Sequence, residues 1–577
     1  MYIANLSTRS RLVLLLPLLA MACSRGPGEV AIPEAAILEY IPADTPYVLA
    51  ALQSAPDEVA AKLGAGSVRV AKAYAGVVKA ALDQPPAEGQ EPLLGPEGRE
   101  RVRAVIDELV ALVTPEGMPA AGIDRSSTAA IYGVGLLPVL RVTLSDPAKF
   151  EAVFERIEER AGKAMTVASV DGHAYRYAGD GDARVIVAVL DGQLVVTLVP
   201  ASLDEELLKL VLGITRPQQA LSDSGELAEL AQTYDFTPYG LGLIDVRRLA
   251  ATFLDEQSGV NAALLSMMEH DRSALSDVCR EEMRTIAGVV PRIVTGYTEM
   301  SEDRIRANSV FELRRDLARG LGKVTAPVPG LGQLQEGLLA FGMSFDLKAL
   351  REFYAARLDA MEADPFECEL LEDLQAQVTS GREALQRPLP PFASQFQGFL
   401  AVINDLKGLD IARKQPPTEV DMRLLISTSN AQGLMAMGAM FLPQIASLDI
   451  KPDSKPVRVE LPPTGAPVDA AWIAMSDDAI VLSVGETADS GLADMLAAKP
   501  AEPPPFLSMS MDAARYYGFL GEAMLAAEAD AGEPSTEVAA ATSELMMALH
   551  EMFDRISFDV QFTERGVELP QTMVLAP

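Results

Sequence analysis

The fold is decided by a segment near the C-terminus that reads Glu544-Leu-Met-Met-Ala-Leu-His-Glu-Met-Phe-Asp-Arg555-Ile-Ser-Phe-Asp-Val-Gln-Phe562. It combines an apolar-periodic helix, an arginine and an alternating strand. The same order occurs earlier, at Glu281-Glu-Met-Arg-Thr-Ile-Ala-Gly-Val-Val-Pro-Arg292-Ile-Val-Thr-Gly-Tyr-Thr-Glu299. Both segments continue through a polar turn into a second strand. Each therefore predicts a helix followed by a hairpin.

Two further pairs of similar segments lie upstream in the same order. Residues 238–254 parallel 505–520, and residues 191–199 parallel 477–485. The offsets drift in one direction, from 286 to 263 residues. Collinear matches with small insertions predict a tandem duplication. A Gly/Pro-rich linker at 319–333 separates copy one, at 41–318, from copy two, at 334–577.

Within the copies, a strand is repeatedly followed by an aspartate and then an amphipathic helix. The aspartates are Asp146, Asp245, Asp346 and Asp512. An aspartate at that place accepts N–H groups of the first helical turn, so we expect N-caps rather than catalytic groups. Strands, hairpins and helices mixed in this way predict an α+β fold. Each copy would be an antiparallel sheet with helices packed against one face.

The N-terminus predicts export. Arg9 and Arg11 precede an apolar run of eleven residues, Leu12 to Ala22. This run is too short to cross a bilayer, which takes about 20 residues, but suits a signal peptide. Leu19-Ala-Met-Ala-Cys23 resembles the bacterial lipobox. The resemblance implies a signal peptide at 1–22, lipid on Cys23 and a tether at 23–40, with an ordinary secretory signal as the alternative.

The segment after the tether, Ile41-Pro-Ala-Asp-Thr-Pro46, follows the lipobox at short range. Together they resemble a family of uncharacterised proteobacterial lipoproteins with a domain of unknown function. The resemblance covers about a dozen residues beyond the lipobox and implies no activity or catalytic residue. Ser24, in place of the aspartate typical of inner-membrane retention, implies the periplasmic face of the Gram-negative outer membrane.

Composition excludes some classes of partner. The 577 residues contain 48 Lys and Arg against 81 Asp and Glu, a net charge of −33. Nucleic acids and anionic membrane surfaces both require basic patches, so neither is an expected partner. With 49% hydrophobic residues the chain has ample material for cores.

The sequence contains no recognisable catalytic, cofactor-binding or metal-binding motif. Its three histidines, His173, His270 and His550, lie far apart, and its carboxylates are too numerous for any pair to stand out. Cys279 and Cys368 are the cysteines left once Cys23 is acylated, and the periplasm is oxidising. We therefore expect a disulfide between them that fixes the angle between the copies, with two buried thiols as the alternative.

The 23 methionines cluster at Met435/Met437/Met440, Met509/Met511 and Met546/Met547/Met552. They suit either an adaptable apolar groove or an ordinary core, and we favour the core.

The leading hypothesis is a non-enzymatic, lipid-anchored binding or interaction protein without a cofactor. Its ligand would be a cell-envelope protein, a peptide or a lipid. The alternative is a carboxylate-dependent cell-envelope hydrolase.

Overall fold

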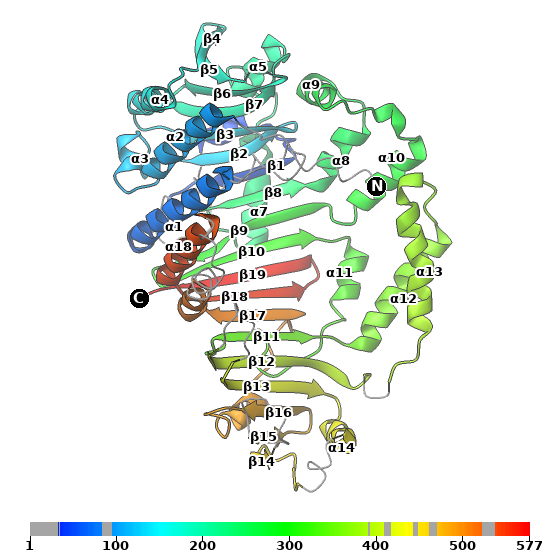
Figure 1. Cartoon of the computed structure of the whole chain (residues 1–577). Coiled ribbons are helices and arrows are strands. Elements are labelled where there is room, and N and C mark those ends of the chain that lie inside the picture. Colours follow the sequence, from blue (N-terminus) through cyan, green and yellow to red (C-terminus); the bar gives the residue numbers. More distant parts are fainter. Residues whose placement is uncertain are drawn as a thin grey trace. The chain divides into compact units, whose positions relative to one another are not determined.

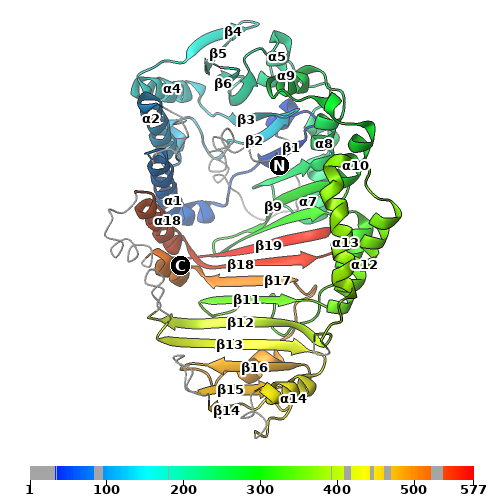
Figure 2. The same cartoon turned by 45° about the vertical axis from the view of Figure 1, so that its right-hand side comes forward.

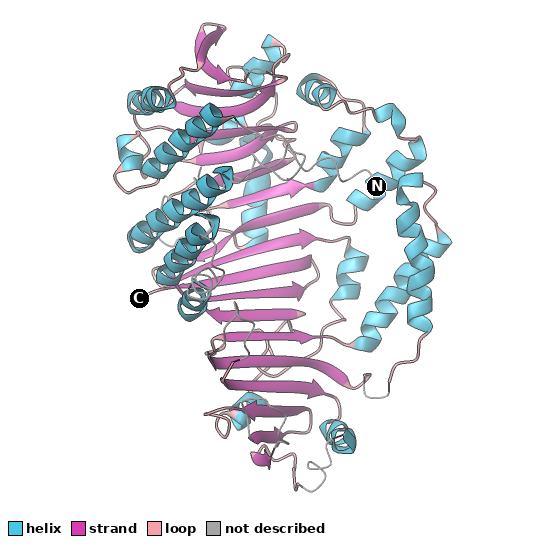
Figure 3. Cartoon of the chain, in the orientation of Figure 1, coloured by secondary structure: helices cyan, strands magenta, loops and turns pink. Residues whose placement is uncertain are grey.

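The structure is a computed structural model that describes residues 33, 35–83, 95–179, 181–390, 393–408, 417–441, 448–460, 470–521 and 537–577. The elements are labelled in Figure 1, and Figure 3 distinguishes helices from strands. The described residues form two compact units. The first comprises those of Met1–Arg272, Val294–Ile305 and Thr536–Ala548, and the second those of Ser273–Ile293, Arg306–Ser535 and Leu549–Pro577.

The first unit is built on an antiparallel sheet with the strand order β8-β1-β2-β3-β7-β6-β5-β4. The strands are β1 (Tyr47–Ala51), β2 (Ala129–Val134), β3 (Leu137–Thr143), β4 (Thr166–Val170), β5 (His173–Ala178), β6 (Ala183–Leu190), β7 (Gln193–Pro200) and β8 (Leu241–Asp245), and most of β9 (Arg292–Met300) also belongs here. The helices are η4 (Ala36–Tyr40), α1 (Asp57–Asp83), α2 (Pro96–Leu112), α3 (Gly117–Ala120), α4 (Pro147–Ala161), α5 (Glu205–Leu212), α6 (Leu221–Ser224), α7 (Glu226–Tyr234), α8 (Val246–Leu254) and α9 (Gly259–Met267), together with most of α18 (Glu537–Met552).

The second unit has its own antiparallel sheet, in the order β14-β15-β16-β13-β12-β11-β17-β18-β19. The strands are β11 (Leu339–Ser344), β12 (Phe396–Lys407), β13 (Glu419–Thr428), β14 (Val457–Glu460), β15 (Ala470–Met475), β16 (Ala479–Val484), β17 (Leu507–Asp512), β18 (Phe553–Phe562) and β19 (Gly566–Leu575), and most of β10 (Arg304–Glu312) also belongs here. The helices are η5 (Arg272–Ala274), α10 (Asp277–Ala287), α11 (Arg315–Leu321), α12 (Leu347–Ala363), η6 (Glu369–Leu371), α13 (Glu372–Gln386), α14 (Ala431–Phe441) and α16 (Leu492–Ala497).

The four predicted N-caps are confirmed. Asp146 accepts the N–H groups of Ala148 and Lys149, and Asp245 accepts that of Arg248. Asp346 and Asp512 cap α12 and the helix at 513–521 through the N–H groups three residues on, each at 2.9 Å. Each of these caps satisfies a donor that the first helical turn would otherwise leave unpaired.

In the first unit, helices pack on both faces of the sheet and not on one as expected. Leu140 and Val142 of β3 form a core with Phe150 of α4 and Leu112 of α2. Neighbouring side chains in a strand point to opposite faces, so Arg141 points the other way. Its guanidinium reaches the carbonyl oxygen of Leu212 at the end of α5. Strands β2, β3 and β7 are largely buried on both faces, which requires cover on both.

The main core of the second unit lies on one face of its sheet. Leu400, Leu425 and Val481 there pack against α16 and against Val328 and Leu331. The last two belong to the Gly/Pro-rich segment 319–333, so part of this segment is buried.

Candidate functional site

One face of the second unit's sheet carries large apolar side chains across seven neighbouring strands. Residues directly opposed in an antiparallel ladder point to the same face. The central row is Leu482, Leu424, Ala401, Phe341, Met509, Phe558 and Gln571. The flanking rows are Val484, Met422, Ile403, Leu339, Met511, Ile556 and Met573 on one side, and Ile480, Ile426, Phe399, Met343, Leu507 and Val560 on the other. We call these three rows the Met-Phe face.

The Met-Phe face is half-buried, whereas the opposite face is fully buried at the centre of the sheet. Its side chains have intermediate exposure, except the buried Ile480 and the exposed Gln571. On the other side of the same strands, Ala340, Leu400 and Leu425 are 3%, 2% and 0% exposed. Helix α14 packs in the same cluster as Ile480 and Leu482, at one end of the face. In Figure 2 no described helix lies across β12, β11 and β17 on the side shown.

The size of the face follows from sheet geometry. Seven strands about 4.8 Å apart span about 29 Å, and three rows two residues apart span about 13 Å. Gln571, at one end, is its single polar side chain among the residues named above. The site is therefore a long apolar strip with almost no hydrogen-bonding capacity.

Strand β17 shows an inverted pattern. It reads Leu507-Ser-Met-Ser-Met-Asp, and ordinary alternation would put the methionines inside and the serines in solvent. In the structure Ser508 and Ser510 are 8% and 3% exposed, while Leu507, Met509 and Met511 are half-buried on the Met-Phe face. Met509 and Met511 are therefore not among the fully buried side chains of the core. Met435 does pack into a core, whereas Met440 is 79% exposed.

Behind the Met-Phe face, a carboxyl group lies beside the two buried serines. Asp559 of β18 pairs with Ser508 of β17. Burial raises the pKa of Asp559, and the hydrogen bond from Ser508 opposes that shift. The Ser510 hydroxyl is buried without a hydrogen-bond partner in the described structure. The carboxylate-dependent hydrolase hypothesis expects two or three converging carboxyl groups with raised pKa values. Among the described residues, Asp559 is the carboxyl group whose pKa is raised.

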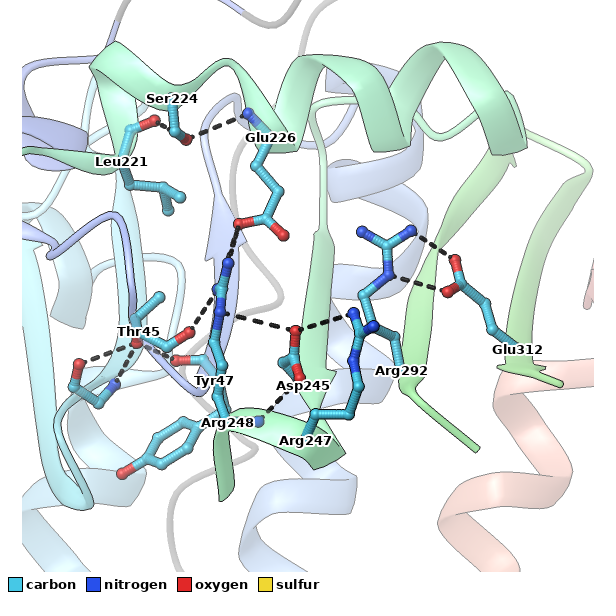
Figure 4. Close-up of polar contacts among 11 residues, drawn as sticks. Thr45, Tyr47, Leu221, Ser224, Glu226, Asp245, Arg247, Arg248, Arg292 and Glu312 are labelled. Carbon is cyan, nitrogen blue, oxygen red and sulfur yellow. Dashed lines mark hydrogen bonds and ion pairs between the residues drawn. The ribbon is translucent and has the colours of Figure 1, made fainter. Parts of the chain in front are cut away.

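A polar network at the start of β1 holds the first unit together (Figure 4). Nη1 of Arg248 donates to the Thr45 carbonyl at 2.9 Å and to Glu226 at 3.3 Å. Asp245, 4% exposed, caps α8 and lies 3.6 Å from Nε of Arg248. The Thr45 hydroxyl lies 2.8 Å from the carbonyl oxygen of Gly133. The segment Ile41–Pro46 thus serves as a structural anchor in this unit.

Figure 4 also shows Arg292 and Glu312, which belong to the second unit. The guanidinium donates to both carboxylate oxygens, at 2.8 and 2.7 Å. This two-pronged geometry is the strong form of the arginine–carboxylate pair. The carboxylates of Glu312, Glu226 and Asp245 are each paired with an arginine, which suits a structural role.

The predicted disulfide between Cys279 and Cys368 is present, with Cα atoms 4.6 Å apart. The bond spans the Gly/Pro-rich linker and joins copy one to copy two of the sequence, as expected. Both cysteines nevertheless belong to the second compact unit, because the units do not coincide with the sequence copies. Cys23, the signal peptide at 1–22 and residues 24–32 and 34 of the predicted tether at 23–40 lie outside the described residues. The end of the predicted tether, Ala36–Tyr40, forms η4, in which Ile37, Leu38 and Tyr40 are buried.

The histidines bond to backbone carbonyls. The rings of His173, His270 and His550 reach the oxygens of Asp171, Phe253 and Ala514, respectively. Within the described ranges, no three His, Cys, Asp or Glu side chains gather as a metal site requires. Nor does any described helix combine the length and apolar character needed to cross a bilayer.

For Met509 and Met511, the sequence offers an apolar groove as the alternative but favours the core, because the alternation does not show which side of a strand is covered. The signal that could have found the Met-Phe face is the regular spacing of methionine between small hydroxyl residues in β17. No protein-family model, curated protein or solved structure matches the chain.

Proposed function

We propose that this chain is a lipid-anchored binding protein of the bacterial envelope that holds long hydrocarbon chains against the Met-Phe face. The anchor on Cys23 would keep it at the periplasmic face of the outer membrane. The observation that carries the binding function is the inverted β17, where serines are buried while Leu507, Met509 and Met511 face outward. Burying hydroxyls and leaving thioethers half-exposed costs stability, which a ligand on that face would explain.

The polarity of the face favours hydrocarbon over a peptide or partner protein. Protein interfaces carry about one hydrogen bond per 100–200 Å². A strip of about 29 by 13 Å, or roughly 380 Å², would then need about two to four. Among the residues of the Met-Phe face, Gln571 is the one side chain that can form such a hydrogen bond. An acyl chain needs no hydrogen bond there, and methionine side chains adapt to its changing shape.

The chain's duplicated organisation is part of the proposal. In the first unit the pairings β8–β1, β1–β2, β2–β3, β3–β7 and β7–β6 follow one another. The second unit repeats this order as β17–β11, β11–β12, β12–β13, β13–β16 and β16–β15. The shared order supports a tandem repeat of one α+β scaffold.

The test is binding of a fluorescent long-chain fatty acid to the purified protein. Met509→Lys places a charge at the centre of the face, and Met440→Lys makes the same change at an exposed position on α14. Each buried CH₂ contributes about 0.8 kcal/mol, so losing contact with two or three weakens binding roughly tenfold or more. We expect that loss for Met509→Lys alone. Equal binding by both variants and the parent chain would exclude this face as the site.

Lipid extraction provides a second measurement on the same protein. Protein purified from envelopes should carry bound lipids that mass spectrometry detects. The Met509→Lys variant should carry fewer of them than Met440→Lys. A non-enzymatic role further requires that the extracted lipids remain intact on incubation with the protein.

A further inference from the structure

Two helices belong to a different unit from the strand that follows them. Helix α10 lies in the second unit, whereas most of β9, which comes next, lies in the first. Helix α18 lies in the first unit up to Ala548, whereas β18, which comes next, lies in the second. These are the two helices that the sequence comparison matched with each other.

Helix α10 is attached to the second unit by three specific bonds. Cys279 forms its disulfide with Cys368, in the turn between α12 and α13. One turn along α10, the carboxylate of Glu282 accepts the backbone N–H groups of Glu367 and Cys368, at 2.8 and 3.0 Å. Both cysteines are nearly fully buried, at 6% and 3% exposure. The attachment therefore joins residue 279 of the first half of the sequence to residue 368 of the second.

Helix α18 comes from the second half of the sequence but packs in the first unit. A Cβ atom on Gly76 of α1 would lie 3.5 Å from the Cβ of Ala541, which is ordinary van der Waals contact. Figures 1 and 2 both show α1 and α18 side by side. Small residues at this point let the two helices approach closely. Residue 541 of the second half thus packs on residue 76 of the first.

We propose that the sequence halves 41–318 and 334–577 exchange these helices reciprocally, so that each half is the obligate binding partner of the other. Each compact unit takes one helix from the opposite half. The exchange is locked by the disulfide at α10, whereas at α18 it includes the close contact between Gly76 and Ala541. The inference concerns assembly and does not depend on the ligand of the Met-Phe face.

The test is to cut the full chain between the halves after it has folded. Gln333 and Leu334 are both exposed, so a protease site inserted between them is accessible. In the parent chain the fragments remain covalently joined until the disulfide is reduced. In a Cys279→Ser/Cys368→Ser background, we expect the cut protein to elute in size-exclusion chromatography as one species of full mass. Circular dichroism of the uncut double variant first establishes that it folds.

A matched pair of variants on α18 separates the exchange from other contacts between the fragments. Ala541→Asp puts a charge against α1, and Ala540→Asp makes the same change at an exposed neighbouring position. We expect the cut Ala541→Asp protein to dissociate at a concentration at least tenfold higher than Ala540→Asp does. The exchange is refuted if the fragments separate with their helix content intact, or if the two variants dissociate alike.

Discussion

A Cβ atom on Gly213 would lie 2.5 Å from Nη2 of Arg141. Arg141 is fully buried and donates to three uncharged acceptors: the Tyr132 hydroxyl, the Gln193 side chain and the Leu212 carbonyl. Its guanidinium also lies 4.0 Å from the centre of the Tyr40 ring. Gly213 ends α5 with φ of 78°, a conformation that glycine adopts without strain.

Gly213→Ala should therefore be strongly destabilising. The left-handed conformation costs alanine about 1–2 kcal/mol, and overpacking against Arg141 adds about 1–3 kcal/mol. Gly162→Ala is the matched control, because Gly162 ends α4 in the same conformation and a Cβ there meets nothing within 4 Å. Urea unfolding should show a larger loss for Gly213→Ala. Equal losses would mean that Arg141 moves aside freely.

Asp245 should matter more than an ordinary N-cap, because it also faces Arg248. Replacing an exposed cap such as Asp346 by alanine costs about 1 kcal/mol. Asp245→Ala removes the cap and also a buried carboxylate beside Arg248, which retains its bonds to Glu226 and the Thr45 carbonyl. The loss should therefore exceed the cost of the cap alone. Asp245→Asn keeps the cap and should fall between the two. The ranking is checked by thermal or urea unfolding, and an Asp245→Ala loss no larger than that of Asp346→Ala contradicts it.

Because the pKa of Asp559 is raised, we expect this residue to make the folded protein less stable as the pH rises. Its pKa is raised by burial above the ordinary 3.8, so the folded state binds its proton more tightly than the unfolded state. Between 3.8 and the raised pKa the folded protein holds more protons, and stability therefore decreases with increasing pH through that window. Asp559→Asn removes this term and can still accept the Ser508 hydrogen bond. Relative to the parent chain, the variant should gain stability from pH 4 to pH 7 in urea titrations. A constant difference between them would refute the assignment.

Cys23→Ala tests the proposed anchor. A chain without the thiol cannot be acylated at that position, so it should leave the membrane fraction or keep its signal peptide. Fractionation and the mass of the N-terminal peptide report both outcomes. The lipobox interpretation is wrong if the variant is cut normally and still sediments wholly with membranes.

The sequence by itself determined the local features of this protein. Asp146, Asp245, Asp346 and Asp512 were identifiable as N-caps because capping depends on one side chain and the next few backbone groups. The Cys279–Cys368 bond followed from counting the cysteines left after Cys23 and from the prediction that the chain is exported to an oxidising compartment. The α+β class followed from hydrophobic periodicity, which is likewise a short-range signal.

Only the tertiary structure decided which face of each strand is covered and which unit receives each helix. The alternation in β17 is the same whether Ser510 or Met509 is buried, because the period of two does not say on which side another layer packs. In the same way, the periodicity of α10 and α18 shows that each has an apolar side but does not identify what it packs against. What each helix packs against is set by contacts between residues far apart in the chain, such as Cys279 with Cys368 and Gly76 with Ala541. The same holds for which strand face is covered. Those contacts depend on the path of the whole backbone, which short-range patterns do not encode.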